Sequence, residues 1–124
     1  MTASADELVQ RARRRIRRVG PHELDAIHSQ GGLLVDIRPS EQRSVEGELP
    51  GAVCIERNVL EWRLDPCGSD RIPEVVGYGQ PVVVICSEGY ASSLAAATLA
   101  DMGYEAPADL RGGYRAWRSW YTRP

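Results

Sequence analysis

The sequence lacks any apolar run of the roughly 18 residues that a membrane span needs. Its first ten residues, MTASADELVQ, also lack the apolar segment of a signal peptide. Lysine is absent, and we attribute the use of arginine at all fifteen basic positions to genome composition. The 124 residues suffice for one domain with a hydrophobic core. We therefore expect a single soluble, cytoplasmic domain that does not bind membranes.

Cysteine is scarce, and only Cys54, Cys67 and Cys86 are present. An odd, widely spaced set is not a disulfide framework, and the absence of a C-x-x-C pair argues against a structural zinc site. We therefore expect no metal and no organic cofactor. In a reducing compartment, the remaining question is whether one of the three thiols is reactive.

Charge of one sign does not dominate the chain, whose formal net charge is −2. Residues 1–20 hold six arginines and two acids, whereas residues 21–124 hold nine arginines and fifteen acids. This balance gives no general attraction to nucleic acid, and we expect no nucleic-acid partner.

The basic N-terminal segment has the pattern of an amphipathic helix over residues 5–18. Its apolar positions are Ala5, Leu8, Val9, Ala12 and Ile16, with arginines on the other faces. We expect residues 1–18 to form a helix packed on a domain of residues 19–124 and to act as scaffold alone. A surface for an acidic partner or for anionic lipid is the alternative.

The rest of the chain alternates between predicted strands and helices. LLVDI (33–37) and VVVIC (82–86) are typical of buried strands, and the turn LPGA leads into a third, near Cys54. Helices are expected over SEQRSVEGE, capped by Ser40, and over 92–102, capped by Ser92 or Ser93 and ended by Gly103. The expected fold class is α/β, with a central, mostly parallel sheet flanked by helices and an extra N-terminal helix.

Cys86 lies where the strongest predicted strand gives way, through SEGYA, to a helix. Ligands bind beyond the carboxyl ends of parallel strands, and a helix N-terminus favours a thiolate, which is the nucleophilic form of cysteine. A buried structural cysteine is the alternative. Phosphatases and arsenate reductases also use a strand, cysteine, loop and helix, but they need a cation in the loop, and SEGYASS has none.

Five motifs, in order, resemble the single-domain rhodanese family of sulfurtransferases from about Val19 to Trp120. LLVDIR is similar to that family's strand with Asp36 and Arg38, and GELPGA to its G-H-I-P-G-A turn. VVVICSEGYAS is similar to its active loop, with Cys86 in the place of the persulfide-forming cysteine. MGY and LRGGYRAW are similar to its closing segment.

The resemblance implies a rhodanese-like domain that moves a sulfane sulfur through a Cys86 persulfide, in two half-reactions and without a cofactor. The implied partners are a small sulfur donor and a thiol acceptor, which could be a protein. The implied substrate-binding loop consists of Ser87, Glu88, Gly89, Tyr90, Ala91 and Ser92. A rhodanese fold used as a non-enzymatic interaction or regulatory module is the alternative.

The sequence departs from the family pattern at three positions. Glu48 stands where the family usually has histidine, and Ala91 where many members have arginine. Glu88 places an acid where users of thiosulfate often have a base. Because the loop lacks side-chain charge for an inorganic dianion, an organic or protein persulfide is favoured over thiosulfate as the donor.

Other residues have candidate roles around this loop. Asp36 and Arg38 are expected to brace the sheet edge and the loop, with direct substrate contact as the alternative. Arg57 is a candidate for substrate contact, with a solvated helix face as the alternative. Cys67 could resolve the persulfide as a disulfide, although a passive loop thiol is favoured. Cys54 is expected in the core.

Two tryptophans, Trp62 and Trp117, are expected to be core or lid aromatics.

Overall fold

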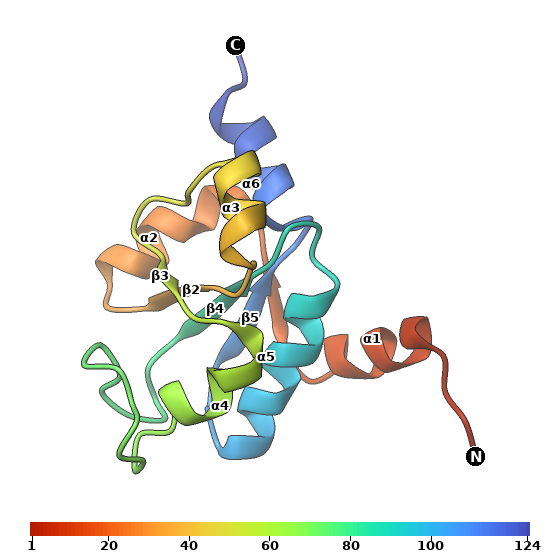
Figure 1. The fold of residues 1–124 in the computed structure, drawn as a ribbon, viewed down its shortest axis with the longest axis vertical. Helices are drawn as coiled ribbons and strands as arrows, with labels where there is room; N and C mark the ends of the chain where they lie inside the picture. Colours follow the sequence, from red (N-terminus) through yellow and green to blue (C-terminus); the bar gives the residue numbers. More distant parts are fainter.

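Five parallel strands form the centre of the molecule, and helices cover both faces (Figure 1). The computed structural model describes all 124 residues. Every neighbouring pair of strands is parallel, and the order across the sheet is β1-β5-β4-β2-β3. The strands are β1 (Arg17–Val19), β2 (Leu33–Asp36), β3 (Val53–Cys54), β4 (Val82–Ile85) and β5 (Pro107–Leu110). The predicted α/β fold class is confirmed.

Six α-helices and two short 3₁₀ helices accompany these strands, with α1 before the first strand and α6 after the last. The α-helices are α1 (Ala5–Arg13), α2 (Leu24–Ser29), α3 (Ser40–Glu46), α4 (Leu60–Arg63), α5 (Ala91–Met102) and α6 (Gly113–Tyr121). The 3₁₀ helices, Pro21–Glu23 and Arg57–Val59, each lead directly into the following α-helix. No helix combines the length and the apolar character that crossing a bilayer demands.

Alternating strand residues divide the core into two layers. Leu33 and Val35 of β2 pack with α5 and with Leu60 of α4 on one face. Leu34 of the same strand packs on the other face, together with Leu24 of α2 and residues of α6. All residues of β2, β4 and β5 are buried, as expected of strands covered on both faces.

The N-terminal segment is shorter as a helix than predicted. The helix α1 ends at Arg13, and Arg17–Val19 form the edge strand β1 instead, in register with Ala108–Leu110 of β5. The reason is tertiary: strand pairing satisfies the backbone of this segment and buries Val19 completely. Figure 1 shows α1 at one side of the molecule, next to α5, on which it packs.

The structure differs from the sequence-based expectations at three further residues. Cys54 is exposed, because β3 is a two-residue edge strand. Trp62 is 61% exposed on the short helix α4 and so lies outside the core, whereas Trp117 is buried in the core as expected. Ser40 is the first residue of α3 and not its cap, which is Pro39.

Candidate active site

The candidate active site lies at the carboxyl end of β4, the central strand of the sheet. The strand ends at Ile85, and Cys86 is the first residue of the loop that leads into α5. Cys86 is buried, with 8% of its surface exposed, but it lines a cavity. The sulfur is therefore reached from the cavity and not from the open surface.

Three groups of the loop converge on the sulfur of Cys86. The backbone N–H of Gly89 donates to it at 3.1 Å, and the N–H of Ser92 at 3.3 Å. The thiol itself donates to the hydroxyl oxygen of Ser92 at 3.2 Å. Inward-facing N–H groups at a helix N-terminus favour a negative charge, so this arrangement suits a thiolate or a persulfide anion.

The two glycines of LRGGYRAW, Gly112 and Gly113, lie in close backbone contact with the loop that follows Cys86. Gly89 has φ +90°, and a Cβ there would lie 2.8 Å from the backbone nitrogen of Gly112. A Cβ on Gly113 would lie 2.6 Å from the carbonyl oxygen of Cys86. The N–H of Tyr114 donates to that same oxygen at 2.8 Å. Because the two backbones approach each other closely, glycine is needed both in the loop, at Gly89, and at the start of α6, at Gly113.

A buried ion-pair network flanks the loop on the side of β2. The guanidinium of Arg38 binds the carboxylate of Asp36 at 2.7 Å and that of Glu46 at 3.1 Å, and it lies over the ring of Tyr114. Glu46 in turn accepts a hydrogen bond of 2.7 Å from the hydroxyl of Ser87, next to Cys86. Asp36 and Arg38 are thus connected to the loop through Glu46, a residue that the sequence reasoning missed.

In this network, burial and neighbouring charges shift the pKa of a side chain in opposite directions. Burial alone would lower the pKa of Arg38, but Asp36 and Glu46 raise its pKa, so it stays charged. Burial alone would raise the pKa of Glu46, but hydrogen bonds from Ser87, Arg38 and Arg115, with the charge of Arg115, hold its pKa below the ordinary value of 4.5. Glu46 is therefore ionised at neutral pH.

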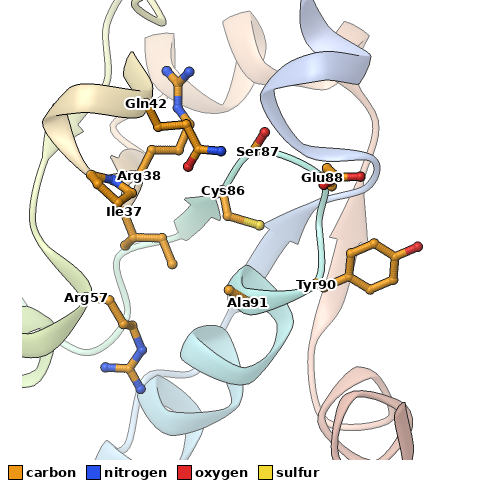
Figure 2. A pocket seen from close by; sticks show the side chains of 10 residues that line it. Ile37, Arg38, Gln42, Arg57, Cys86, Ser87, Glu88, Tyr90 and Ala91 are labelled. Carbon is orange, nitrogen blue, oxygen red and sulfur yellow. The ribbon is translucent and has the colours of Figure 1, made fainter. Parts of the chain in front are cut away.

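The cavity in front of the sulfur has a volume of about 390 Å³. Figure 2 shows Cys86 at its centre, Arg57 at one side, and Glu88 and Tyr90 at the other. The guanidinium groups of Arg38 and Arg57 are both directed away from the sulfur. The remaining lining residues are Ile37, Pro39, Gln42, Ser87 and Ala91.

Arg57 and Glu88 each have a charged neighbour. Arg57 is paired with Glu61 at 3.0 Å, one turn further along the chain. Glu88 is 58% exposed and lies 3.8 Å from Arg115 of α6, a partner that the sequence reasoning did not consider. Ala91 brings no charge, so the loop itself contains no cation.

The sequence predicts that Ser92 or Ser93 caps α5, but neither serine does so. The helix begins at Ala91 after Tyr90, and the hydroxyls of Ser92 and Ser93 both donate to the carboxylate of Asp109, at 2.8 and 2.7 Å. Asp109, on β5, is completely buried. Because Ser92 and Ser93 lie within the first turn of α5 and not before it, neither is at the cap position, and their hydroxyls donate to this carboxylate instead.

Two arginines that precede the domain predicted for residues 19–124 contact Asp109 and Ser93. Arg18 of β1 binds Asp109 at 2.9 Å, and Arg13 of α1 binds the hydroxyl of Ser93 at 3.1 Å. Both also donate to the carbonyl oxygen of Gly89, at 3.0 and 2.8 Å. The N-terminal segment therefore contacts the loop as well as α5.

Cys67 lies far from this site. Its sulfur accepts a long contact of 3.9 Å from the hydroxyl of Tyr78, and Tyr78 packs on Tyr104, just beyond the C-terminal end of α5. Cys86 lies at the opposite end of that helix, whose twelve residues span about 18 Å. A disulfide between Cys67 and Cys86 is excluded in this conformation. No group of three or more His, Cys, Asp or Glu side chains is arranged to hold a metal ion.

The sequence model of a protein family, the rhodanese-like domain, matches residues 20–119 of this chain. The chain belongs to the rhodanese-like family. It is 30% identical over 107 residues to the thiosulfate sulfurtransferase GlpE of Pseudomonas syringae, and the match covers 86% of this chain and 92% of GlpE. It is 32% identical over 106 residues to UBA4 of Meyerozyma guilliermondii, an adenylyltransferase and sulfurtransferase. That match covers 83% of this chain but only 24% of UBA4.

Solved structures share the fold of this chain. A rhodanese homologue from Thermus thermophilus is 32% identical, has a TM-score of 0.58, and is matched over 81% of this chain and 99% of its own. A protein of unknown function from Rhodopseudomonas palustris, described as a possible tyrosine phosphatase, is 28% identical with a TM-score of 0.86. That match covers 98% of this chain and 93% of the other, so it extends over α1 and β1.

Proposed function

We propose that this protein is a sulfurtransferase that carries a sulfane sulfur on Cys86, from an organic or protein persulfide to an acceptor thiol. The observation that carries the proposal is the sulfur of Cys86 at the base of a cavity, with the N–H groups of Gly89 and Ser92 directed at it. The sulfurtransferase relatives support the general activity.

The proposed reaction has two half-reactions with no net oxidation. In the first, the Cys86 thiolate attacks the outer sulfur of a persulfide R–S–SH. The S–S bond of the donor breaks, R–S⁻ leaves, and Cys86 becomes a persulfide. In the second, an acceptor thiolate attacks the outer sulfur, the new S–S bond breaks, and the Cys86 thiolate returns. We assign the N–H groups of Gly89 and Ser92 to the sulfur anions formed along the way.

The lining of the cavity favours an organic donor over thiosulfate. Thiosulfate is a small dianion, and neither cation of the lining is free to meet it at the sulfur. Arg38 is committed to Asp36, Glu46 and the carbonyl of Gly47, and Arg57 is paired with Glu61 and directed away. Apolar side chains such as Ile37, by contrast, provide a surface for an organic body.

Within this proposal, the flanking residues have supporting roles. Asp36 and Arg38 hold Glu46, and Glu46 holds Ser87, so that the start of the loop is fixed. Arg57 remains accessible at the side of the cavity, where it would meet a carboxylate on the organic part of the donor. The loop residues from Ser87 to Ser92 would bind the sulfur that is transferred.

Phosphoryl transfer is the activity suggested by the description of the R. palustris protein. It would require a cation that clamps the phosphoryl oxygens beside the nucleophile. The loop offers Glu88 instead, and the guanidinium groups of Arg38 and Arg57 do not face the sulfur. We therefore favour sulfur transfer over phosphatase activity.

Intact mass spectrometry tests the proposal. The purified protein is exposed in turn to glutathione persulfide, mercaptopyruvate and thiosulfate, and we expect the addition of one sulfur atom, fastest with the organic persulfide. The matched control is Cys86→Ser, which should gain no sulfur although it keeps its fold, because the change is nearly isosteric. Sulfur uptake by Cys86→Ser, or hydrolysis of p-nitrophenyl phosphate without uptake by the wild type, would overturn the proposal.

A further inference from the structure

We propose that Arg18 and Arg13 are positioning residues of the active site: Arg18 neutralises Asp109, and both arginines hold the loop so that Gly89 and Ser92 face the Cys86 sulfur. Both residues precede the matched rhodanese-like region, residues 20–119. The segment of α1 and β1 would then be part of the catalytic unit. The catalytic consequence rests on the proposed function, whereas the effect on the thiol does not.

The first step of the argument is the position of Asp109. Its carboxylate is completely buried and lies two hydrogen bonds from the Cys86 sulfur, through the hydroxyl of Ser92. An uncompensated negative charge at that place opposes a thiolate on Cys86. Arg18 is the cation that meets it, with Nε 2.9 Å from one carboxylate oxygen and Nη2 3.3 Å from the other.

The second step concerns the hydrogen of the Ser92 hydroxyl. That hydroxyl has one hydrogen, which it gives to Asp109, so it can only accept from the Cys86 thiol. When Cys86 is a thiolate, the Ser92 hydrogen must turn towards sulfur for a favourable contact. Because Arg18 neutralises Asp109, and Ser93 also donates to the same oxygen, Asp109 keeps its partners when Ser92 turns away.

The third step is the carbonyl group of Gly89. It accepts hydrogen bonds from Arg13 at 2.8 Å and from Arg18 at 3.0 Å. The N–H of the same residue points at the Cys86 sulfur. Two cationic donors on one carbonyl thus fix the residue whose amide faces the reacting atom, while its φ of +90° keeps the turn tight.

Arg13 also connects α1 to the wall of the cavity. Its guanidinium lies 5.5 Å from the ring centre of Tyr90, which lines the cavity. The helix is fixed against the domain by the buried side chains of Val9 and Ala12, and by an ion pair between Arg15 and Asp101 of α5. Movement of α1 would therefore disturb both the loop backbone and the cavity.

The other charged groups near Cys86 belong to separate ion pairs. Arg38, Glu46 and Arg115 form one connected network at Ser87, Glu88 is exposed beside Arg115, and Arg57 is paired with Glu61. None of these contacts Asp109 or the Gly89 carbonyl. The positive charge next to Asp109 and the Gly89 carbonyl thus comes from Arg18 and Arg13.

The test is the pH profile of Cys86 alkylation by iodoacetamide, followed by peptide mass spectrometry. We expect Arg18→Gln to slow alkylation about tenfold at and below neutral pH, because the buried carboxylate of Asp109 then opposes the thiolate. Arg18→Lys should retain most of the reactivity. Arg13→Gln should slow alkylation less, because Arg18 still holds Gly89. The matched control is Arg11→Gln, an exposed arginine of α1, which should behave as the wild type.

The double variant Arg18→Gln, Asp109→Asn separates charge from folding. It removes the buried carboxylate together with its partner, so it should fold even where Arg18→Gln alone does not, and its profile should return towards that of the wild type. An Arg18→Gln profile that matches the Arg11→Gln control, or a double variant that stays as slow as Arg18→Gln, would overturn the proposal. Since alkylation needs no sulfur donor, a shifted profile without any persulfide formation would refute the sulfurtransferase activity and leave this inference standing.

Discussion

The backbone N–H of Gly89 lies 3.1 Å from the sulfur of Cys86, and the carbonyl of the same residue is held by two arginines from the N-terminal segment. One residue thus joins the reacting atom to a part of the chain more than 70 positions away. Its φ of +90° is a conformation that residues with a Cβ rarely adopt.

Gly89→Ala should therefore disable the loop. The added Cβ would lie 2.8 Å from the nitrogen of Gly112, a backbone atom that cannot move aside without shifting α6. We expect at least a tenfold loss of Cys86 alkylation at neutral pH and a destabilisation of about 1–3 kcal/mol. Urea unfolding and per-residue alkylation measure the two effects. Gly31→Ala is the control, because it has a similar φ of +94° but open space around its Cβ. Equal loss of alkylation in both variants would argue against a local effect on the loop.

Cys86 should be the most reactive of the three thiols at and below neutral pH. Partial burial, followed by the charges of Asp36 and Glu48, raises the pKa of Cys54 above the ordinary value of 9.0, despite the opposing charge of Arg43. The sulfur of Cys67 has only the long contact with Tyr78. Alkylation rates of each cysteine, measured across pH, provide the check. Faster reaction of exposed Cys54 or Cys67 below neutral pH would show that the loop N–H groups do not activate Cys86.

Glu46 should stabilise the fold in a pH-dependent way. Its pKa is held below 4.5, which means that the folded state stabilises the ionised carboxylate of Glu46 more than the unfolded chain does. This stability is fully present above the unfolded value of 4.5 and is lost as the pH falls through the lower folded value. Glu46→Gln should cost about 1–3 kcal/mol at neutral pH, with a gap from the wild type that closes in acid.

Urea unfolding at a series of pH values measures that gap. Exposed Glu41 lies on the same helix, and Glu41→Gln should leave the free energy of unfolding nearly unchanged. A gap between Glu46→Gln and the wild type that persists unchanged at low pH would mean that the carboxylate acts through packing and not through its charge.

Local sequence patterns were sufficient to predict the centre of the fold and the position of Cys86. The β-branched run before Cys86 and the alanine-rich segment after it carry their own propensities, so β4 and α5 are close to their predicted limits. The edge strand β1 and the inner strand β5 were missed. Arg17–Val19 continue an apparent helical pattern, and β5 begins with Pro107 and contains a buried acid.

Contacts between distant parts of the chain could not be predicted from the sequence. Arg13 and Ser93 are 80 positions apart, and Ser87 and Glu46 are 41 apart, so no spacing rule connects them. A signal existed for Asp109: it is an acid in the segment between Gly103, where α5 ends, and the glycine pair of the closing motif. That segment must return the chain to the sheet, which makes a buried strand necessary there.

The last prediction concerns the charge of Glu88 at the edge of the cavity. A carboxylate there opposes an incoming dianion, but it is 58% exposed and faces Arg115 at 3.8 Å, so its effect is screened. Glu88→Gln should therefore improve the use of thiosulfate by at most several-fold, more at low salt than at high salt, and should affect a neutral organic persulfide less. Steady-state rates with both donors at two ionic strengths give the comparison. Glu105→Gln makes the same change in net charge beyond the opposite end of α5 and should have no effect. Equal, salt-independent changes for both donors would show that Glu88 acts through the structure of the loop and not through its charge.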